Sequence, residues 1–340
     1  MKTEFIPQSE LTDEAIERAG AILRDGGLVV FPTETVYGLG ANALDANAAR
    51  KIYAAKGRPS DNPLIVHIAN PCEAEKYAVV CKDYDKLADA FMPGPLTVIL
   101  PKKSCIPDTV SGGLDSVGIR CPGSDVARRL IRAAGVPVAA PSANLSGKPS
   151  PTTAAHTLAD LDGKVDMILD GGPCRVGLES TIIKLENGKA TLLRPGGITP
   201  DMLRALIPSL TLADAVTNQL SPDARPLSPG MKYRHYAPAA PLTLVGGSDE
   251  RRRAYFAASA ADTLLLVFDE EADLFPKRNL ITIGGQKDAK AQASRLFASL
   301  READKRGCTA ILAPLPEKEG LSLALYNRMI RAAAHHIVML

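Results

Sequence analysis

The apolar positions of the chain alternate between two kinds of run. Spacings of three and four predict a helix that Thr12 caps and that runs to about Arg24, and a second helix over residues 46–55 that Asp45 caps. Short continuous apolar runs predict buried strands, at residues 28–31, 64–68, 96–100, 116–120 and 167–169. Helices that separate short buried strands are typical of an α/β protein.

The pattern changes twice toward the C-terminus. Residues 180–185 and 190–194 flank Asn187-Gly188 and predict a β-hairpin. Residues 211–241 are proline-rich, extended and basic, so we predict a linker there, between a domain at 1–210 and a second at 242–340. In the second domain, short apolar strands alternate with helical stretches, which predicts a small, largely parallel, Rossmann-like α/β sheet.

Composition and charge exclude several classes of protein. The 340 residues are 46% hydrophobic and 23% charged, which is ordinary for a globular protein. A net charge of +2, an aromatic content of 4% and the absence of Trp argue against nucleic-acid binding as the main activity. The six cysteines form no Cys-x-x-Cys pair, so the usual zinc spacings are missing. With no signal-peptide or membrane-span pattern, we expect a cytoplasmic protein.

Cations and hydroxyl groups gather in three predicted loops. Lys56 and Arg58 stand at a helix end before the strand that contains His67, as expected of an anion site, although a solvated basic turn would look the same. Residues 32–40 follow a buried strand and are rich in hydroxyls; they predict a ligand loop or a turn that caps its own backbone. Residues 141–153 could present amides and serines to an anion, or form a flexible loop, and are not a Walker A loop.

Together these loops resemble the Sua5/YrdC family of threonylcarbamoyl-AMP synthases, in its long two-domain Sua5 form. Lys56-Gly-Arg58 and Ser142-Ala-Asn144 correspond to the KxR and SxN pairs of the family. The resemblance covers roughly residues 8–208, and the segment 228–238 with the second domain is similar to the Sua5 extension. The other matching stretches are 32–40, 63–67, 93–97, 178–182 and 193–196.

The resemblance implies a nucleotidyltransferase that condenses L-threonine, bicarbonate or CO2, and ATP into threonylcarbamoyl-AMP and pyrophosphate. The product would serve N6-threonylcarbamoyladenosine formation at position 37 of tRNAs that read ANN codons, with partner proteins that transfer the group and, at most, a weak tRNA contact. The implied fold is a YrdC-like twisted, mixed, open sheet with flanking helices, plus a smaller Rossmann-like α/β domain.

The resemblance also implies roles for individual residues. The catalytic set is Lys56, Arg58, Ser142 and Asn144, with both cations expected near the surface. The protein supplies no metal ligand set of its own, and Mg²⁺ is expected through the ATP phosphates. The residues expected to contact ATP are Arg58, Asn62, Ser116, Ser142, Ser150, Arg194, His235 and Tyr236. The residues expected at the threonine site are Thr35, His67, Arg120, Ala140 and Ser180.

Two rival functions remain open at this point. A carbamoyl-adenylate-forming maturation enzyme shares a related domain, but it adds an acylphosphatase-like module and cysteine-rich zinc motifs that are not found here. An RNA-binding module without catalysis would need only a concave basic surface. The basic segment 228–238 is expected to act as a lid over the nucleotide, although a stiff spacer could hold the same residues.

Overall fold

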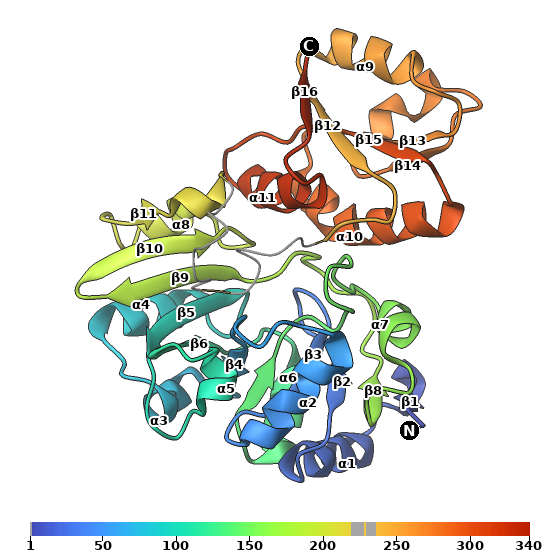
Figure 1. Cartoon of the computed structure of the whole chain (residues 1–340). Helices are drawn as coiled ribbons and strands as arrows, with labels where there is room; N and C mark the ends of the chain where they lie inside the picture. The colour runs from blue at the N-terminus through green and yellow to red at the C-terminus, as the bar shows by residue number, and fades with distance from the viewer. Residues whose placement is uncertain (1, 219–227, 229–235) are drawn as a thin grey trace. The chain divides into compact units, whose positions relative to one another are not determined.

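The computed structural model describes residues 2–218, 228 and 236–340. They divide into two compact units, each with its own sheet and helices (Figure 1). No helix among these residues is both long and apolar enough to cross a bilayer. The first unit comprises Met1–Ser146 and Ser150–Lys232, and the second comprises Gly147–Pro149 and Tyr233–Leu340.

The first unit is built on an eleven-stranded sheet in the order β1-β8-β2-β3-β7-β4-β6-β5-β9-β10-β11. Parallel and antiparallel pairs both occur, so the expected mixed sheet is confirmed. The strands are β1 (Glu4–Ile6), β2 (Val29–Phe31), β3 (Gly38–Asn42), β4 (Ile65–His67), β5 (Leu96–Pro101), β6 (Ser116–Arg120), β7 (Val138–Ala140), β8 (Met167–Leu169), β9 (Thr181–Glu186), β10 (Lys189–Arg194) and β11 (Thr211–Leu212). β11 lies within the interval 211–241 and pairs with β10.

The helices of the first unit flank this sheet, and local signals set their ends. The Thr12 hydroxyl accepts a hydrogen bond from the amide of Ala15, and Gly57 and Gly135 end two helices in the left-handed conformation at φ 60° and 69°. The helices are α1 (Asp13–Arg24), α2 (Ala46–Lys56), α3 (Ala74–Tyr77), α4 (Lys82–Phe91), α5 (Asp108–Ser111), α6 (Asp125–Ala134), α7 (Ala154–Leu161) and α8 (Pro200–Arg204), with 3₁₀ turns at Gln8–Glu10, Pro71–Glu73 and Asp214–Val216.

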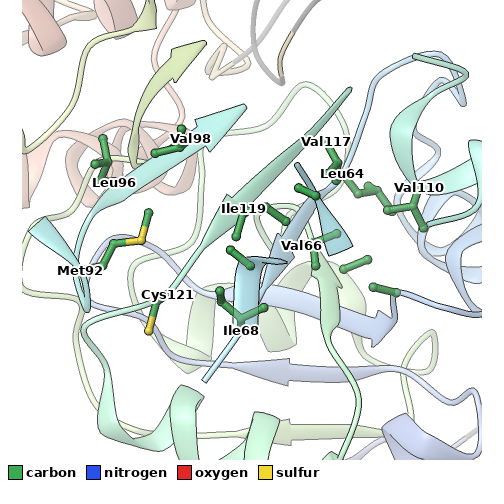
Figure 2. Close-up of a cluster of buried hydrophobic side chains, with 14 of the residues drawn as sticks. Leu64, Val66, Ile68, Met92, Leu96, Val98, Val110, Val117, Ile119 and Cys121 are labelled. Carbon is green, nitrogen blue, oxygen red and sulfur yellow. The ribbon is translucent and has the colours of Figure 1, made fainter. Parts of the chain in front are cut away.

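The main hydrophobic core covers one face of the central strands. Val66, Ile119 and Val98 come from the neighbouring strands β4, β6 and β5 and are fully buried there (Figure 2). Because successive side chains of a strand point to opposite faces, the residues next to these point to the other face of the sheet. His67 and Arg120, which follow Val66 and Ile119, therefore lie on that other face.

One expected loop is partly a strand. We expected residues 32–40 to form a loop, but β3 begins at Gly38 and pairs with β2. A Cβ atom on Gly40 would lie 2.9 Å from the Phe31 ring and 2.8 Å from Val138, so only glycine fits the close approach of these strands. The ligand loop is therefore shorter than predicted and ends before β3.

The second unit is a five-stranded, entirely parallel sheet in the order β14-β13-β15-β12-β16. This confirms the small parallel α/β sheet, although we did not anticipate β16, a short, partly exposed strand that pairs with β12. The elements are β12 (Leu242–Gly246), α9 (Asp249–Ala257), β13 (Thr263–Val267), a 3₁₀ turn (Asp269–Leu274), β14 (Leu280–Thr282), α10 (Ala289–Arg306), β15 (Ala310–Pro314), α11 (Ser322–Ala332) and β16 (Ile337–Met339).

Candidate active site

The loop between β2 and β3 caps its own backbone and presents two polar side chains. The Thr33 hydroxyl donates to the carbonyl of Val36 at 2.6 Å, and it accepts from the amides of Thr35 and Val36 at 3.2 Å. A second segment fixes the loop from outside, because the amide of Val176 donates to the carbonyl of Glu34 at 2.8 Å. Glu34 and Thr35 are thus held in place, 7% and 0% exposed.

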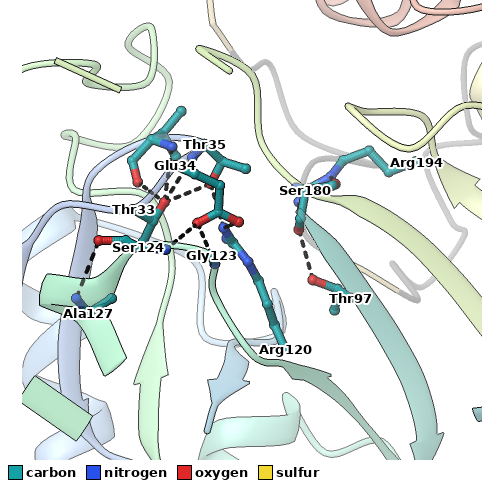
Figure 3. A network of polar contacts seen from close by, with 11 residues as sticks. Thr33, Glu34, Thr35, Thr97, Arg120, Gly123, Ser124, Ala127, Ser180 and Arg194 are labelled. Atoms are coloured by element: carbon teal, nitrogen blue, oxygen red, sulfur yellow. Dashed lines mark hydrogen bonds and ion pairs between the residues drawn. The ribbon is translucent and has the colours of Figure 1, made fainter. Parts of the chain in front are cut away.

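Arg120 reaches this loop from the end of β6. Its Nη2 atom donates to Oγ1 of Thr35 and to Oε1 of Glu34, both at 2.8 Å (Figure 3). The Arg120 side chain is 5% exposed and the Glu34 side chain 6%, so this is a buried ion pair. The Nε atom of Arg120 is buried without a hydrogen-bond partner among the described residues. A buried guanidinium with an unused donor suits an anionic ligand.

His67 lies beside Arg120 on the same face of the sheet. The register of β4 places it next to Arg120 on one side and Val138 on the other. Its Nδ1 atom is 3.1 Å from the carbonyl oxygen of Ile65, so the neutral ring donates there. Burial, and then the charge of Arg120, lower the pKa of His67 to about 3. Ala140 is buried on β7 and pairs with Ile65.

A second polar group stands where β9 begins, and Figure 3 shows it to the right of Arg120. The hydroxyls of Ser180 and Thr97 are 2.8 Å apart. The guanidinium of Arg194 donates to the carbonyl oxygen of Ser180 at 3.0 Å and to its hydroxyl at 3.1 Å. The carboxylate of Glu179, the residue before Ser180, accepts a hydrogen bond from the Ser150 hydroxyl at 2.5 Å. Ser150, Ser180 and Arg194 are thereby linked through neighbouring residues.

Lys56 binds the loop that contains Ser142 and Asn144. Its ammonium donates to the carbonyl oxygens of both residues and lies 3.5 Å from Oδ1 of Asn144, which accepts from the Ser142 hydroxyl at 2.6 Å. We expected Lys56 near the surface, and this was wrong, because the side chain is directed into the loop and only 2% of the residue is exposed. The structure therefore brings together Lys56, Ser142 and Asn144 as one cluster.

Arg58 and Asn62 form a smaller group. The guanidinium of Arg58 donates to the carbonyl oxygens of Asn62 at 3.3 Å and Pro63 at 3.1 Å. Oδ1 of Asn62 is buried without a hydrogen-bond partner among the described residues. A cavity of about 10 Å³, roughly the room for one water molecule, lies beside Pro63 and Ser116.

Two of the residues expected at the ATP site, His235 and Tyr236, belong to the predicted linker. His235 lies outside the described residues. Tyr236 belongs to the second unit, where its ring packs 5.2 Å from that of Phe297 and under the guanidinium of Arg328 at 5.8 Å.

Sequence reasoning missed three residues of the site: Glu34, Thr97 and Glu179. Each is buried and hydrogen-bonded to an expected site residue. All three lie within the stretches that match the family. Glu34 also carried a chemical signal, because a carboxylate is rarely buried without a cationic partner.

Two of the six cysteines are buried, and neither of these two thiols is suited to act as a nucleophile. Burial raises the pKa of Cys121 to about 11 and that of Cys174 to about 12, so both thiols stay protonated at neutral pH. No group of three or more His, Cys, Asp or Glu residues among those described could hold a metal ion.

Comparisons with known proteins cover both units. A family model described as "Telomere recombination" (Sua5, YciO and YrdC) matches residues 21–196, and one described as "Threonylcarbamoyl-AMP synthase, C-terminal domain" matches 198–334. Curated relatives named threonylcarbamoyl-AMP synthase include those of Pyrococcus abyssi, 42% identical with 95% of each chain covered, and Bacillus subtilis, 42% identical with 96% of this chain and 95% of the relative covered.

Two solved structures are also similar to this chain in fold. The P. abyssi Sua5 complexed with L-threonine has a TM-score of 0.90 at 40% identity and covers 100% of both chains. Escherichia coli YciO has a TM-score of 0.52 at 26% identity and covers 58% of this chain and 97% of that protein.

Proposed function

The chain belongs to the threonylcarbamoyl-AMP synthase family, and from this premise we propose that it condenses L-threonine, bicarbonate or CO2, and ATP into threonylcarbamoyl-AMP and pyrophosphate. The observation that carries the proposal is the cluster of Arg120, Thr35 and His67, which offers a buried cation and neutral polar groups to a small amino acid. The relative from P. abyssi was solved in complex with L-threonine.

The amino-acid side of the site would use the buried cluster. Arg120 would bind the carboxylate of threonine, because a guanidinium matches a carboxylate in charge and geometry. Thr35, Ser180 and the neutral ring of His67 would hydrogen-bond the amine and hydroxyl, with Ala140 on the floor of the site. A neutral imidazole leaves the threonine amine free of a competing positive charge.

The nucleotide side would use the loops with Lys56 and Arg58. Lys56 would keep Ser142 and Asn144 in place, and Arg58 would contact the phosphates. Asn62, Ser116, Ser150, Arg194, His235 and Tyr236 complete the set we propose for ATP. Mg²⁺ would be carried mainly by the ATP phosphates.

The chemistry needs positioning more than a protein nucleophile. The threonine amine adds to CO2 to form a carbamate, and a carbamate oxygen attacks the α-phosphorus of ATP. The bond from that phosphorus to the bridging oxygen breaks, and pyrophosphate leaves. Because the carbamate and the triphosphate are both anions, the main tasks of the site are alignment and charge neutralisation.

The product would be passed to partner proteins that form N6-threonylcarbamoyladenosine at position 37 of tRNA, with at most a weak tRNA contact by this chain. We propose that this takes place in the cytoplasm. The domain limits proposed from the sequence, 1–210, 211–241 and 242–340, would place the catalytic residues in the first part and a lid in the second. Residues 219–227 and 229–235 of that second part lie outside the described residues.

Incubation of the full chain with ATP, bicarbonate and radiolabelled threonine tests the proposal. The expected result is threonine-dependent release of pyrophosphate and a labelled adenylate. An RNA-binding module would instead release no pyrophosphate and bind RNA in a salt-sensitive manner. A carbamoyl-adenylate-forming enzyme would show no pyrophosphate release that depends on threonine.

A further inference from the structure

Glu34 is the one carboxylate in the loop between β2 and β3, and both of its oxygens are engaged. Oε1 accepts from Nη2 of Arg120 at 2.8 Å, and Oε2 accepts from the backbone amides of Gly123 at 2.9 Å and Ser124 at 3.3 Å. Ser124 caps α6, so the carboxylate joins the β2–β3 loop to the turn between β6 and α6. Figure 3 shows Glu34 between these two partners.

The bridge constrains Arg120 from one side only. Nη2 of Arg120 is held by Glu34 and by Thr35, whereas its buried Nε atom has no partner among the described residues. A guanidinium carries five N–H donors, so it can keep one carboxylate partner and still bind another anion. The geometry thus leaves part of the guanidinium available while it prevents the long side chain from turning away.

Glu34 remains ionised in this position. Burial by itself would raise its pKa, but the charge and hydrogen bonds of Arg120, with the backbone amides, outweigh burial and hold the pKa below its ordinary value. The pair is therefore a fixed carboxylate and a fixed guanidinium, each with less than a tenth of its side chain exposed. Such a carboxylate is a rigid support for the cation.

We propose that Glu34 is a positioning residue that aims Arg120 at the carboxylate of the amino-acid substrate. The inference rests on the proposed function. Glu34 does not touch the substrate; it acts through Arg120. It also offsets the positive charge that would otherwise stand alone in the buried site, so that recognition depends on the direction of the guanidinium as well as on its charge.

Glu34→Gln tests this inference directly. An amide side chain has one acceptor oxygen, so either Arg120 or the two backbone amides must face its NH2 donors. Titration calorimetry on the full chain would compare L-threonine with L-threoninamide, which lacks the carboxylate. Wild type should prefer threonine, and Glu34→Gln should reduce that preference by about tenfold or more, because the guanidinium loses its alignment.

Glu73→Gln is the matched control. Glu73 also accepts two backbone amides, from Ala69 at 3.0 Å and Asn70 at 3.2 Å, in the same unit. This variant should lose a similar local cap and keep the preference for threonine over threoninamide. If Glu34→Gln does not fold, Glu34→Asp keeps the charge on a shorter side chain and should show an intermediate preference.

The outcomes separate the inference from a purely structural role. If Glu34→Gln melts at a lower temperature but keeps the wild-type preference, Glu34 is only a cap of the turn before α6, and the inference is overturned. A wild type that does not distinguish threonine from threoninamide would also overturn it. A wild type that prefers threonine but releases no pyrophosphate with it would overturn the proposed function and leave this test of Glu34 valid.

Discussion

Two buried cations of the first unit, Arg120 and Lys56, differ in what surrounds them. Arg120 faces a carboxylate and a hydroxyl and keeps a buried donor without a partner among the described residues. Lys56 is buried to a similar degree, 2% against 4% exposed, but its described partners are two carbonyl oxygens and an amide oxygen of one loop.

The comparison indicates two different uses of positive charge. A guanidinium has five donors in a fixed plane, so Arg120 can keep its protein partners and still receive a ligand. An ammonium has three donors, and three described acceptors surround that of Lys56. We therefore expect Arg120 to contact substrate directly, and Lys56 to act by shaping the loop that contains Ser142 and Asn144.

Among the variants that test this comparison, Arg120→Ala should have the largest effect on stability. It leaves Glu34 as an unpaired buried carboxylate, so the free energy of unfolding should fall by about 3–5 kcal/mol. The threonine requirement should rise strongly while nucleotide binding persists. Urea unfolding and calorimetry with threonine and an ATP analogue measure the two effects.

Two further variants test whether the loss of stability in Arg120→Ala comes from the buried Glu34 carboxylate. Arg18→Ala removes an exposed ion pair with Glu4 and should cost about 0–1 kcal/mol. Adding Glu34→Ala to Arg120→Ala should recover part of the lost stability, since the lone carboxylate is gone. If Arg120→Ala keeps its affinity for threonine but loses nucleotide binding, our division of the site is reversed.

Lys56→Ala should come next. It leaves the carbonyl oxygens of Ser142 and Asn144 without their buried donor, so we expect about 3 kcal/mol lower stability and a weaker affinity for ATP. Lys51→Ala is the matched control, because this exposed lysine of the same helix donates to a single carbonyl, that of Gly26 at 2.7 Å. Equal losses in the two variants would contradict the proposed role of the Lys56 cluster.

The pH dependence of stability should reveal His67 beside Arg120. Its folded pKa of about 3 lies below the ordinary value of 6.5, so the unfolded chain binds more protons between these values. The contribution of the neutral His67 ring to the free energy of unfolding is fully present above pH 6.5. It is lost as the pH falls, by about 2 kcal/mol at pH 5. Denaturant titrations should show a flatter pH profile for His67→Gln; an unchanged profile would mean that folding does not lower the pKa of His67.

Among the variants of the candidate site, Arg58→Ala should have the smallest effect on stability. The half-buried guanidinium donates to two carbonyl oxygens of its own loop, so we expect a loss of about 1 kcal/mol. The ATP concentration for half-maximal rate should rise by about tenfold, because the proposed phosphate contact is charge-assisted. A rise in the threonine requirement alone would assign Arg58 to the other side of the site.

Much of the fold could be predicted because its signals are local. Thr12 and Asp45 cap helices through amides two or three residues away, and both caps were expected. The hairpin at Asn187-Gly188 was also expected, because Asn-Gly favours the positive φ that such a turn needs. In the structure these two residues have φ angles of 51° and 72°. Many of the candidate site residues came from the resemblance, and their spacing alone left solvated or self-capping loops open.

Tertiary structure alone decided how the candidate site residues are arranged. Arg120 is hydrogen-bonded to Thr35 and Glu34, which lie 85 and 86 positions away in the sequence. Lys56 is hydrogen-bonded to residues 142 and 144, which lie 86 and 88 positions away. The strand order that brings them together depends on which apolar faces pack, and no local pattern encodes it. For this reason the sequence by itself determined most of the elements, several of their caps and the family, while the burial of Lys56 and the bridge through Glu34 came only from the folded chain.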